Sequence, residues 1–272
     1  MQAAPPPDGA TTQPAVQALP AFTDNYIWLL RHQGLAAVVD PGDAAPVLEA
    51  LAREKLRLRA ILLTHHHADH VGGVLELLRA TGARVYGPAR ERLPHCDVPL
   101  GEGDLVELPE LDLCLRVLDV PGHTAGHIAY TGRAAGAAPV LFCGDTLFAA
   151  GCGRLFEGTP EQMLQSLTKF VTLAPETQVF CAHEYTLANL RWAQAVEPAN
   201  RTLREWGEQA RLLRDQGLPT LPSTIGRERA ANPFLRVEQV DVGHAATQWA
   251  GSSLNAPVDV FAALREWKNN FK

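Results

Sequence analysis

The sequence Thr-His-His-His-Ala-Asp-His occupies residues 64–70, directly after a short apolar run, and places four histidines within six positions. The whole chain has ten histidines in 272 residues, so composition alone does not explain this density. Imidazole and carboxylate groups bind borderline divalent metals, and a strand that enters a tight turn can aim alternate side chains at one point. The spacing indicates one ion on His65 and His67, and a second on Asp69 and His70. The alternative is a solvated histidine-rich turn that chelates metal adventitiously.

Other polar residues recur in the same setting, just after predicted strands. They are Asp40, His123, Asp145 and His183. Taken singly, His123, Asp145 and His183 are each better explained as a cap or a satisfied buried group. Open α/β sheets, however, place their ligands at strand ends, so we expect the set to gather near the histidine cluster. For Asp40 we favour a role in orienting a ligand side chain over direct metal binding.

Apolar β-type runs alternate with helical patterns up to about residue 183, and the pattern after that is mainly helical. We expect strands at 26–30, 35–39, 60–63, 84–86, 113–118, 128–130, 140–143 and 179–181, and helices at 44–54, 72–80, 160–173, 185–195, 201–216 and 257–268. Residues 218–234 contain Pro and Gly and are expected to form a loop. The predicted organisation is a flexible tail (1–14), an α/β domain (15–183) and a helical domain (184–272).

Composition excludes several classes of protein. No run approaches the ~20 apolar residues that a membrane span needs. The net charge of −6 argues against nucleic-acid binding, which needs a broad basic surface. The five cysteines are odd in number and contain no C-x-x-C pair, so neither a disulfide framework nor a thiolate zinc site is expected. A reducing cytoplasm fits this pattern best.

Four motifs together resemble the metallo-β-lactamase superfamily, and within it the glyoxalase II (hydroxyacylglutathione hydrolase) family. They are the 64–70 cluster, Pro-Gly-His-Thr-Ala-Gly-His at 121–127, Gly-Asp-Thr-Leu-Phe at 144–148 and Ala-His-Glu-Tyr-Thr at 182–186. The similarity runs from about Leu19 to the C-terminus, with further matching segments at 24–28, 39–43, 150–154, 196–198 and 232–234. The first motif alone indicates the superfamily, and the later ones are particular to the family.

This resemblance implies that the α/β domain (15–183) is catalytic and forms a four-layer αββα sandwich. It implies that the mainly helical C-terminal domain (184–272) binds substrate by helping to hold the thiol carrier. It also implies two divalent metal ions per chain, with Zn²⁺ expected and Fe or Mn as alternatives. One ion would be held by His65, His67 and His123, the second by Asp69, His70 and His183, and Asp145 would bridge the pair. Asp69 and Asp145 thereby count as catalytic residues, since the hydroxide formed between the metals attacks the substrate.

For glutathione, the resemblance implies contacts from Arg154, Tyr185, Arg265 and Lys268. Without it, Arg265 and Lys268, three apart on a predicted helix, would be taken for a solvated surface pair. Two positions depart from the family pattern. Phe156 replaces a tyrosine that contacts substrate in some members, which weakens that contact, and Ala182 replaces a glycine, which costs little unless φ is positive.

The expected activity is hydrolysis of S-(2-hydroxyacyl)glutathione, chiefly S-D-lactoylglutathione, to glutathione and D-lactate by a monomeric enzyme. The nearest alternative is a persulfide dioxygenase-type relative that uses one iron and oxygen, against which the C-terminal pair of cations argues. Hydrolysis of a β-lactam, a lactone or RNA would use similar metal chemistry but leaves the C-terminal motifs or the acidic charge unexplained. A different alternative is a metal-binding module without catalytic activity. Loss of one of the metal-binding residues would favour it, and none of these residues is missing.

Overall fold

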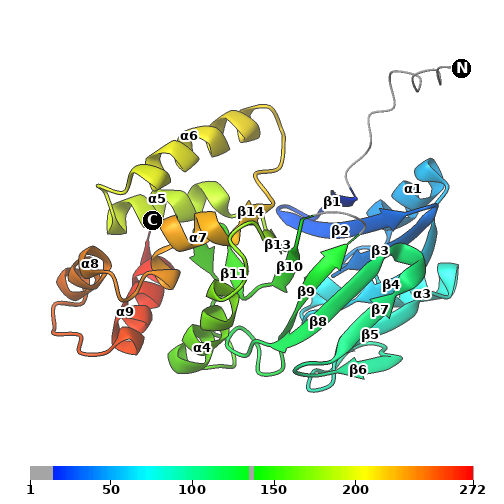
Figure 1. Cartoon of the computed structure of the whole chain (residues 1–272), viewed down its shortest axis with the longest axis horizontal. Helices are drawn as coiled ribbons and strands as arrows, with labels where there is room; N and C mark the ends of the chain where they lie inside the picture. Colours follow the sequence, from blue (N-terminus) through cyan, green and yellow to red (C-terminus); the bar gives the residue numbers. More distant parts are fainter. Residues whose placement is uncertain (1–14, 135–137, 272) are drawn as a thin grey trace, which may run out of the picture.

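The computed structural model describes residues 15–134 and 138–271. The predicted flexible tail at 1–14 lies outside the described residues. Two mixed sheets and the helices around them occupy one side of the molecule in Figure 1, and most of the C-terminal helices lie together on the other. The expected α/β architecture with a helical C-terminal region is confirmed.

The first sheet contains the first six strands in chain order. Its members are β1 (Val16–Ala21), β2 (Asn25–His32), β3 (Leu35–Val39), β4 (Arg57–Leu62), β5 (Arg84–Pro88) and β6 (Val98–Leu100). The β1–β2 and β2–β3 pairs are antiparallel, and the remaining pairs are parallel. Strand β1 lies at the edge, where the missing amide of Pro20 is tolerated.

The second sheet also has six strands. In spatial order they are β14 (Ser223–Thr224), β13 (Gln178–Cys181), β10 (Val140–Gly144), β9 (Ile128–Ala134), β8 (Leu113–Asp119) and β7 (Leu105–Leu108). Only β10 and β13 pair in parallel within this sheet as described. Strand β14 comes from the C-terminal part of the chain, which therefore contributes directly to the sheet.

Successive side chains of a strand point to opposite faces of its sheet, so the first sheet packs against one layer on each side. Trp28 on β2 faces the second sheet, where its ring lies 4.9 Å from that of Phe180 on β13. The neighbouring Leu29 faces the other way, into a separate apolar cluster with Val47 and Leu77. These last two residues come from α1 (Ala45–Glu54) and α3 (Val74–Thr81). With α4 (Pro160–Val171) beyond the second sheet, the arrangement is the expected αββα sandwich.

The C-terminal helices are mostly those that the sequence predicts. They are α5 (Thr186–Val196), α6 (Arg201–Asp215), α7 (Ile225–Ala231), α8 (Val240–Ala250) and α9 (Pro257–Asn270). Helix α5 packs on α6, and α8 packs on α9. The prediction of a loop over 218–234 is wrong, because this segment holds β14, α7 and the 3-10 turn η2 (Pro233–Leu235).

The elements between residues 218 and 234 were missed because they are short. Helix α7 has seven residues, too few for an apolar period to stand out, and it begins because the Thr224 side chain accepts a hydrogen bond from the Arg227 amide. Helix α8 was not expected either, since only Val242 and Ala246 along it are buried. The predicted helix at 72–80 corresponds to α3, and a separate short helix, α2 (Ala68–Val71), precedes it, with Gly72 and Gly73 between the two.

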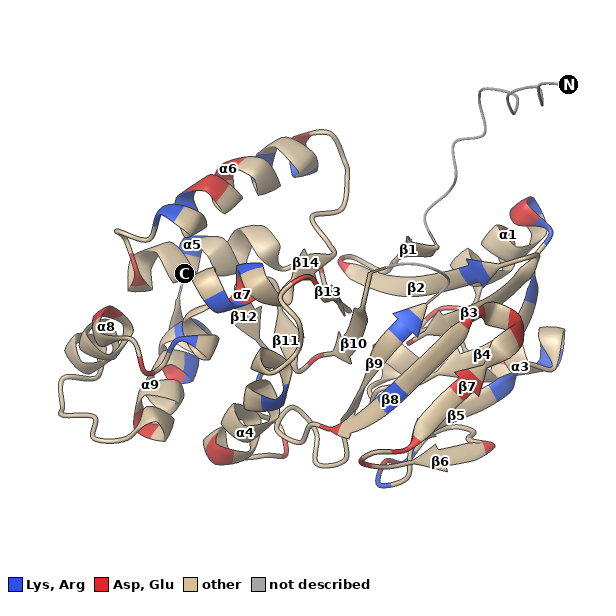
Figure 2. Ribbon diagram, in the orientation of Figure 1, with Lys and Arg blue, Asp and Glu red and all other residues tan. Residues whose placement is uncertain are grey.

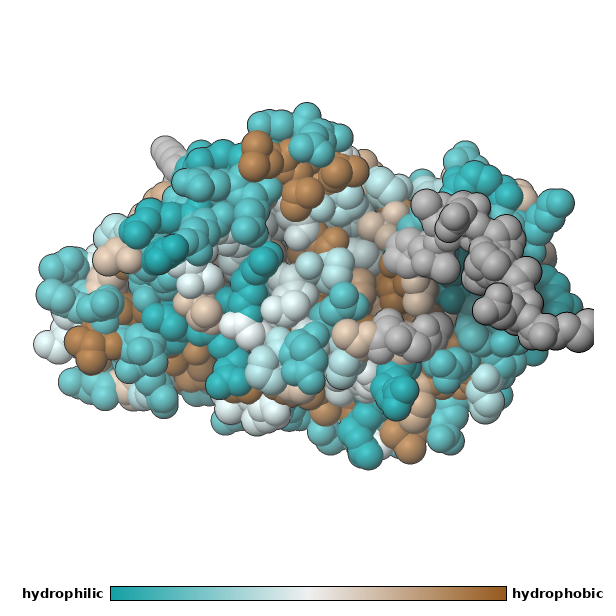
Figure 3. Space-filling view, turned by 45° about the horizontal axis from the view of Figure 1, so that its top comes forward, coloured by the Kyte–Doolittle hydropathy of each residue, from teal (hydrophilic) through white to brown (hydrophobic). Residues whose placement is uncertain are grey.

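The surface carries charges of both signs, and Figure 2 shows them interspersed along α6. The face in Figure 3 is largely hydrophilic, with smaller apolar areas between the polar groups. Among the helices of residues 15–134 and 138–271, none is long and apolar enough to span a membrane.

Candidate metal centre

Three imidazoles converge where β4 and β8 end. His65 and His67 follow β4, and His123 lies in the connection from β8 to β9. Nδ1 of His67 lies 3.0 Å from Nε2 of His65 and 3.0 Å from Nε2 of His123. The three ligand atoms could therefore hold one metal ion, and we call this set the first trio.

A second trio is formed by Asp69, His70 and His183. Oδ2 of Asp69 lies 3.6 Å from Nε2 of His70 and 3.5 Å from Nε2 of His183. His183 follows β13, far along the chain from the loop and short helix that supply the other two.

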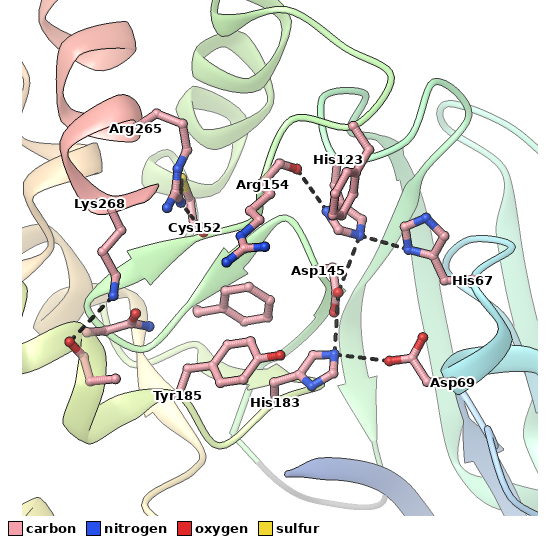
Figure 4. Close-up of a pocket in the computed structure, with 14 residues that line it drawn as sticks. His67, Asp69, His123, Asp145, Cys152, Arg154, His183, Tyr185, Arg265 and Lys268 are labelled. Carbon is pink, nitrogen blue, oxygen red and sulfur yellow. Dashed lines mark hydrogen bonds and ion pairs between the residues drawn. The ribbon is translucent and has the colours of Figure 1, made fainter. Parts of the chain in front are cut away.

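Asp145 stands between the two trios, directly after β10. Its carboxylate oxygens lie 3.3 Å from Nε2 of His123 and 3.4 Å from Nε2 of both His70 and His183. One carboxylate therefore contacts both sets of ligands, which is the arrangement expected for a bridging residue (Figure 4).

These residues fit a pair of cations. Two ligands of a tetrahedral zinc, each about 2.1 Å from the metal, lie about 3.4 Å apart, close to the spacings found here. Nε2 of His70 and Oδ1 of Asp145 are buried and have no hydrogen-bond partner in the described part of the chain. Buried polar atoms are normally paired, and metal coordination would satisfy both.

The electrostatics also suit metal binding. Burial and neighbouring imidazoles hold the pKa of His65 well below its usual value, so this side chain is a neutral ligand. Burial would raise the pKa of Asp145, but the imidazoles of His70 and His183 outweigh it and hold the pKa well below its usual value. Burial likewise opposes a proton on His70, yet the carboxylates of Asp145 and Asp40 raise its pKa well above the usual value. A cation can take the place of that proton.

Hydrogen bonds to the outer nitrogens orient the ligands. Nδ1 of His70 lies 3.1 Å from a carboxylate oxygen of Asp40, and Nδ1 of His183 lies 2.8 Å from one of Asp24. The third acceptor is the backbone carbonyl of Arg154, 2.9 Å from Nδ1 of His123. Such bonds turn Nε2 of each ring inward. The position of Asp40 thus agrees with the indirect role expected for it.

Close backbone approaches allow the loops to meet. Gly144 has a φ of +48°, and a Cβ there would lie 2.4 Å from Oγ1 of Thr64 and 2.8 Å from the His127 ring. Only glycine fits such a position. His127 stacks on His65 and accepts a hydrogen bond from the Asp145 amide at 3.1 Å, so it supports the centre without joining it.

A pocket of about 450 Å³ opens beside the two trios. Its lining includes Arg154 after β12 (Gly151–Cys152), Tyr185 at the start of α5, and Arg265 and Lys268 on α9. Figure 4 shows the ligand residues at one end, the α9 cations at the other, and Arg154 and Tyr185 between them. The structure thus brings together all four residues predicted to contact substrate.

Arg265 differs from the simple expectation of a substrate-gripping cation. The residue is only 6% exposed, and its Nη1 donates to the backbone carbonyls of Cys152 at 2.6 Å and Gly153 at 3.4 Å. It therefore holds in place the segment that carries Arg154. Nζ of Lys268 makes only a long contact, 3.5 Å from the carbonyl of Ala188, so this ammonium can reorient more easily to bind a ligand.

The two departures from the family pattern have simple structural outcomes. Phe156 is 61% exposed, lines the pocket and places its ring 5.7 Å from that of His67 and 5.2 Å from that of His123. An apolar ring thus lies beside the first trio at this position. Ala182 is not among the residues with positive φ, so replacement of glycine there causes no strain.

A buried network connects the C-terminal helices to the β11–β12 hairpin (β11, Leu147–Phe148). Glu228 on α7 accepts hydrogen bonds from the Ala150 amide at 3.0 Å, the Asn232 side chain at 3.0 Å and the Ser223 hydroxyl. Asn232 also donates to the carbonyl of Gly151 at 2.9 Å. This network fixes the hairpin that leads to Arg154.

Glu228 makes stability depend on pH. Burial raises its pKa from 4.5 to about 7, so between these values the folded state keeps a proton that the unfolded chain releases. The free energy of unfolding therefore falls as pH rises through this window, by at most about 1.4 kcal/mol per pH unit. We expect Glu228→Gln to reduce this slope. Urea unfolding should therefore show that the free energy of unfolding of the variant rises relative to that of the wild type from pH 5 to pH 7. A difference that stays constant with pH would contradict the assignment.

The sequence assigned no role to several residues that support the centre. Asp24 and Asn25 were noted only as part of a matching segment, although the Asn25 side chain donates to Asp69 at 3.0 Å. Glu228 and Asn232 had no predicted role. Asp24, Asn25 and Asn232 are polar residues in segments that match the family but contain no predicted ligand. That position was the signal that the sequence offered for them.

Comparison with known families follows the same division of the chain. Residues 21–183 match the model of the metallo-beta-lactamase superfamily, and residues 184–271 match that of the hydroxyacylglutathione hydrolase C-terminus. A hydroxyacylglutathione hydrolase of Alkalilimnicola ehrlichii is 58% identical, with 93% of this chain and 98% of that protein covered. One of Pseudomonas putida is 55% identical, with 94% and 99% covered.

Solved structures show the same fold. The crystal structure of ETHE1 from Myxococcus xanthus superposes with a TM-score of 0.62 at 24% identity, covering 94% of this chain and 91% of that one. At this identity the likeness concerns the fold alone. The family models and the two relatives, which span nearly the whole chain, place the protein in the hydroxyacylglutathione hydrolase family of the metallo-β-lactamase superfamily.

Proposed function

We propose that this protein hydrolyses the thioester of S-(2-hydroxyacyl)glutathione, chiefly S-D-lactoylglutathione, to glutathione and D-lactate. The observation that carries the proposal is the meeting of two ligand trios on one carboxylate, Asp145, at the end of a pocket lined with cations from the C-terminal helices. The family of the chain points to the same reaction.

A divalent cation on each trio would supply Lewis acidity, which lowers the pKa of water toward neutrality and polarises a carbonyl group. We propose Zn²⁺ in both positions, although imidazole and carboxylate ligands also accept iron and manganese. The chain itself contributes orientation. Asp40, Asp24 and the Arg154 carbonyl fix the rings of His70, His183 and His123, so no ligand has to reorganise during the reaction.

The remaining pocket residues suit the carrier. Glutathione has two carboxylates, and guanidinium or ammonium groups bind carboxylates with charge-assisted hydrogen bonds. Arg154 and Lys268 supply such groups. Tyr185 stacks on His183, with ring centroids 4.8 Å apart, and burial together with nearby carboxylates raises the pKa of its hydroxyl. That hydroxyl therefore stays protonated and can donate a hydrogen bond to the bound thioester.

Lys268 gives the proposal a pH signature. Burial and the neighbouring guanidinium groups lower its pKa to about 8, so the free enzyme loses this cation as pH rises through that value. We expect kcat/KM for S-D-lactoylglutathione to fall on an alkaline limb near pH 8. Lys268→Arg keeps the charge at higher pH, and the limb should move upward in a kcat/KM–pH profile. A limb that is the same in both proteins would assign it to another group.

The reaction itself is tested by metal analysis of the purified protein together with a thioester assay. Two metal ions per chain and rapid release of thiol from S-D-lactoylglutathione are the expected results. One iron per chain with oxygen uptake in the presence of a persulfide would instead favour the dioxygenase alternative. No thiol release from the fully metal-loaded protein would refute the proposal.

We infer a cytoplasmic location and a monomer as part of the same proposal. The described cysteines, Cys96, Cys114, Cys143, Cys152 and Cys181, are all free thiols, as expected in a reducing compartment.

A further inference from the structure

Glu91 is a buried carboxylate outside both trios that the proposed reaction does not use. It follows β5, and its side chain is only 2% exposed. Oε1 accepts hydrogen bonds from the Thr124 hydroxyl at 2.7 Å and the Gly126 amide at 2.8 Å, and Oε2 contacts Nδ1 of His66. A buried charge is costly unless it is paired, and here three donors surround it.

These donors come from the two loops that carry the first trio. His66 lies between His65 and His67, and its ring turns away from the centre to reach Glu91. Thr124 follows His123 directly and is fully buried. One carboxylate thus ties together the two chain segments that carry Nδ1 of His67 and Nε2 of His123, which lie 3.0 Å apart.

The second trio has separate support. The Asp24 carboxylate receives Nδ1 of His183 at 2.8 Å, and the Asn25 side chain holds Asp69 at 3.0 Å. Asp24 directly precedes β2 and Asn25 is its first residue, so both are remote from Glu91 in the chain. Loss of Glu91 is therefore expected to affect the first trio, and loss of Asp24 or Asn25 the second.

We propose that Glu91 is a positioning residue that sets the metal affinity of the first trio by clamping its two loops together. The inference rests on the two-cation centre of the proposed function. Changes in the groups that orient metal ligands typically weaken metal affinity by about 10- to 100-fold. Because the second trio is braced by Asp24 and Asn25, the effect is confined to one of the two metal ions.

Glu157 offers a matched control. It also joins the two loops, since it accepts the Ala125 amide at 2.8 Å and lies 3.6 Å from Nε2 of His66. Its side chain, however, is 40% exposed. Water can replace an exposed carboxylate as hydrogen-bond acceptor, so its removal is expected to leave metal affinity unchanged.

The test is a titration of the metal-free full chain with Zn²⁺ in competition with a chromogenic chelator, which yields two stepwise dissociation constants. Glu91→Ala should weaken one step by about 10- to 100-fold and leave the other unchanged. Asp24→Ala should weaken the other step, because Asp24 bonds the ring of His183 in the second trio directly, whereas Glu157, among the described residues, contacts no member of either trio. The double variant should weaken both steps, and Glu157→Ala neither. Two unchanged constants in Glu91→Ala, equal weakening of both, or action of Glu91 and Asp24 on the same step would each overturn the proposal.

Two further variants keep the test decisive if Glu91→Ala does not fold. Thr124→Val removes one donor at nearly constant volume and should weaken the same step, whereas Thr124→Ser, which keeps the hydroxyl, should not. An unchanged Thr124→Val would then overturn the clamp. A wild-type protein that binds fewer than two Zn²⁺ would instead refute the two-cation centre itself, so the two failures can be told apart.

Discussion

Asp145→Ala is expected to lower kcat/KM for S-D-lactoylglutathione by more than about 100-fold and to reduce the bound metal below two ions per chain. Outer groups that merely orient ligands already account for 10- to 100-fold effects, and this residue contacts both trios directly. Its removal also leaves His70 and His183 without the carboxylate that offsets their buried charge. Steady-state kinetics and metal analysis of the same preparation would measure both effects.

Asp119→Ala is the matched control for this prediction. Asp119 ends β8, but its carboxylate pairs at the surface with Arg90, at 3.4 Å, and exposed pairs of this kind contribute little. We expect both activity and metal content of this variant to equal those of the wild type. If Asp145→Ala keeps two metal ions and its activity, the bridging assignment is wrong.

Lys268→Ala should raise KM by about 10- to 100-fold with little change in kcat. A hydrogen bond to a charged group contributes about 1.5–3 kcal/mol, and about 1.4 kcal/mol corresponds to a factor of ten. The lost interaction concerns the carrier rather than the reacting carbonyl, so ground state and transition state are affected alike. Initial rates over a range of substrate concentrations would separate KM from kcat.

Arg265→Ala should behave differently, although the two residues share one helix. Its guanidinium is buried against the carbonyls of Cys152 and Gly153, so its loss loosens the segment that ends in Arg154. We expect KM to rise, kcat to fall and the free energy of unfolding to decrease. Lys169→Ala, which removes an exposed cation paired with Glu102, serves as the control. Identical kinetics for Lys268→Ala and Arg265→Ala would contradict this division of roles.

The sequence was enough to propose the candidate ligand set, because the chemistry of these side chains is visible in it. Histidine and aspartate after successive apolar runs are unusual enough to be noticed, and in the structure the ends of β4 in the first sheet and of β8, β10 and β13 in the second bring these positions together. Apolar runs and helical patterns that alternate along the chain predicted an α/β fold, and the resemblance to the family implied the αββα sandwich. The C-terminal helices with long apolar periods, α6 and α9, were located within about two residues of their observed ends.

The remaining features depend on tertiary packing that local patterns do not encode. Arg265 has the sequence neighbourhood of a solvated cation, and only the fold buries it on the hairpin. Glu91 and Glu228 likewise resemble surface carboxylates until distant donors surround them. Helix α7 is short and depends on its cap and on its contacts with α6 and β14.

Strand β14 has a practical consequence for building hybrid enzymes. Thr224 and Ser223 pair with Gln178 and Val179 of β13, so the C-terminal part supplies the border of a sheet that belongs to the other half. A graft made at residue 183 would discard this border unless the donor brings an equivalent one, and would leave β13 with unsatisfied backbone groups able to recruit another chain. A hybrid meant to accept a new thiol carrier should therefore keep this chain through residue 232 and exchange only the final helices.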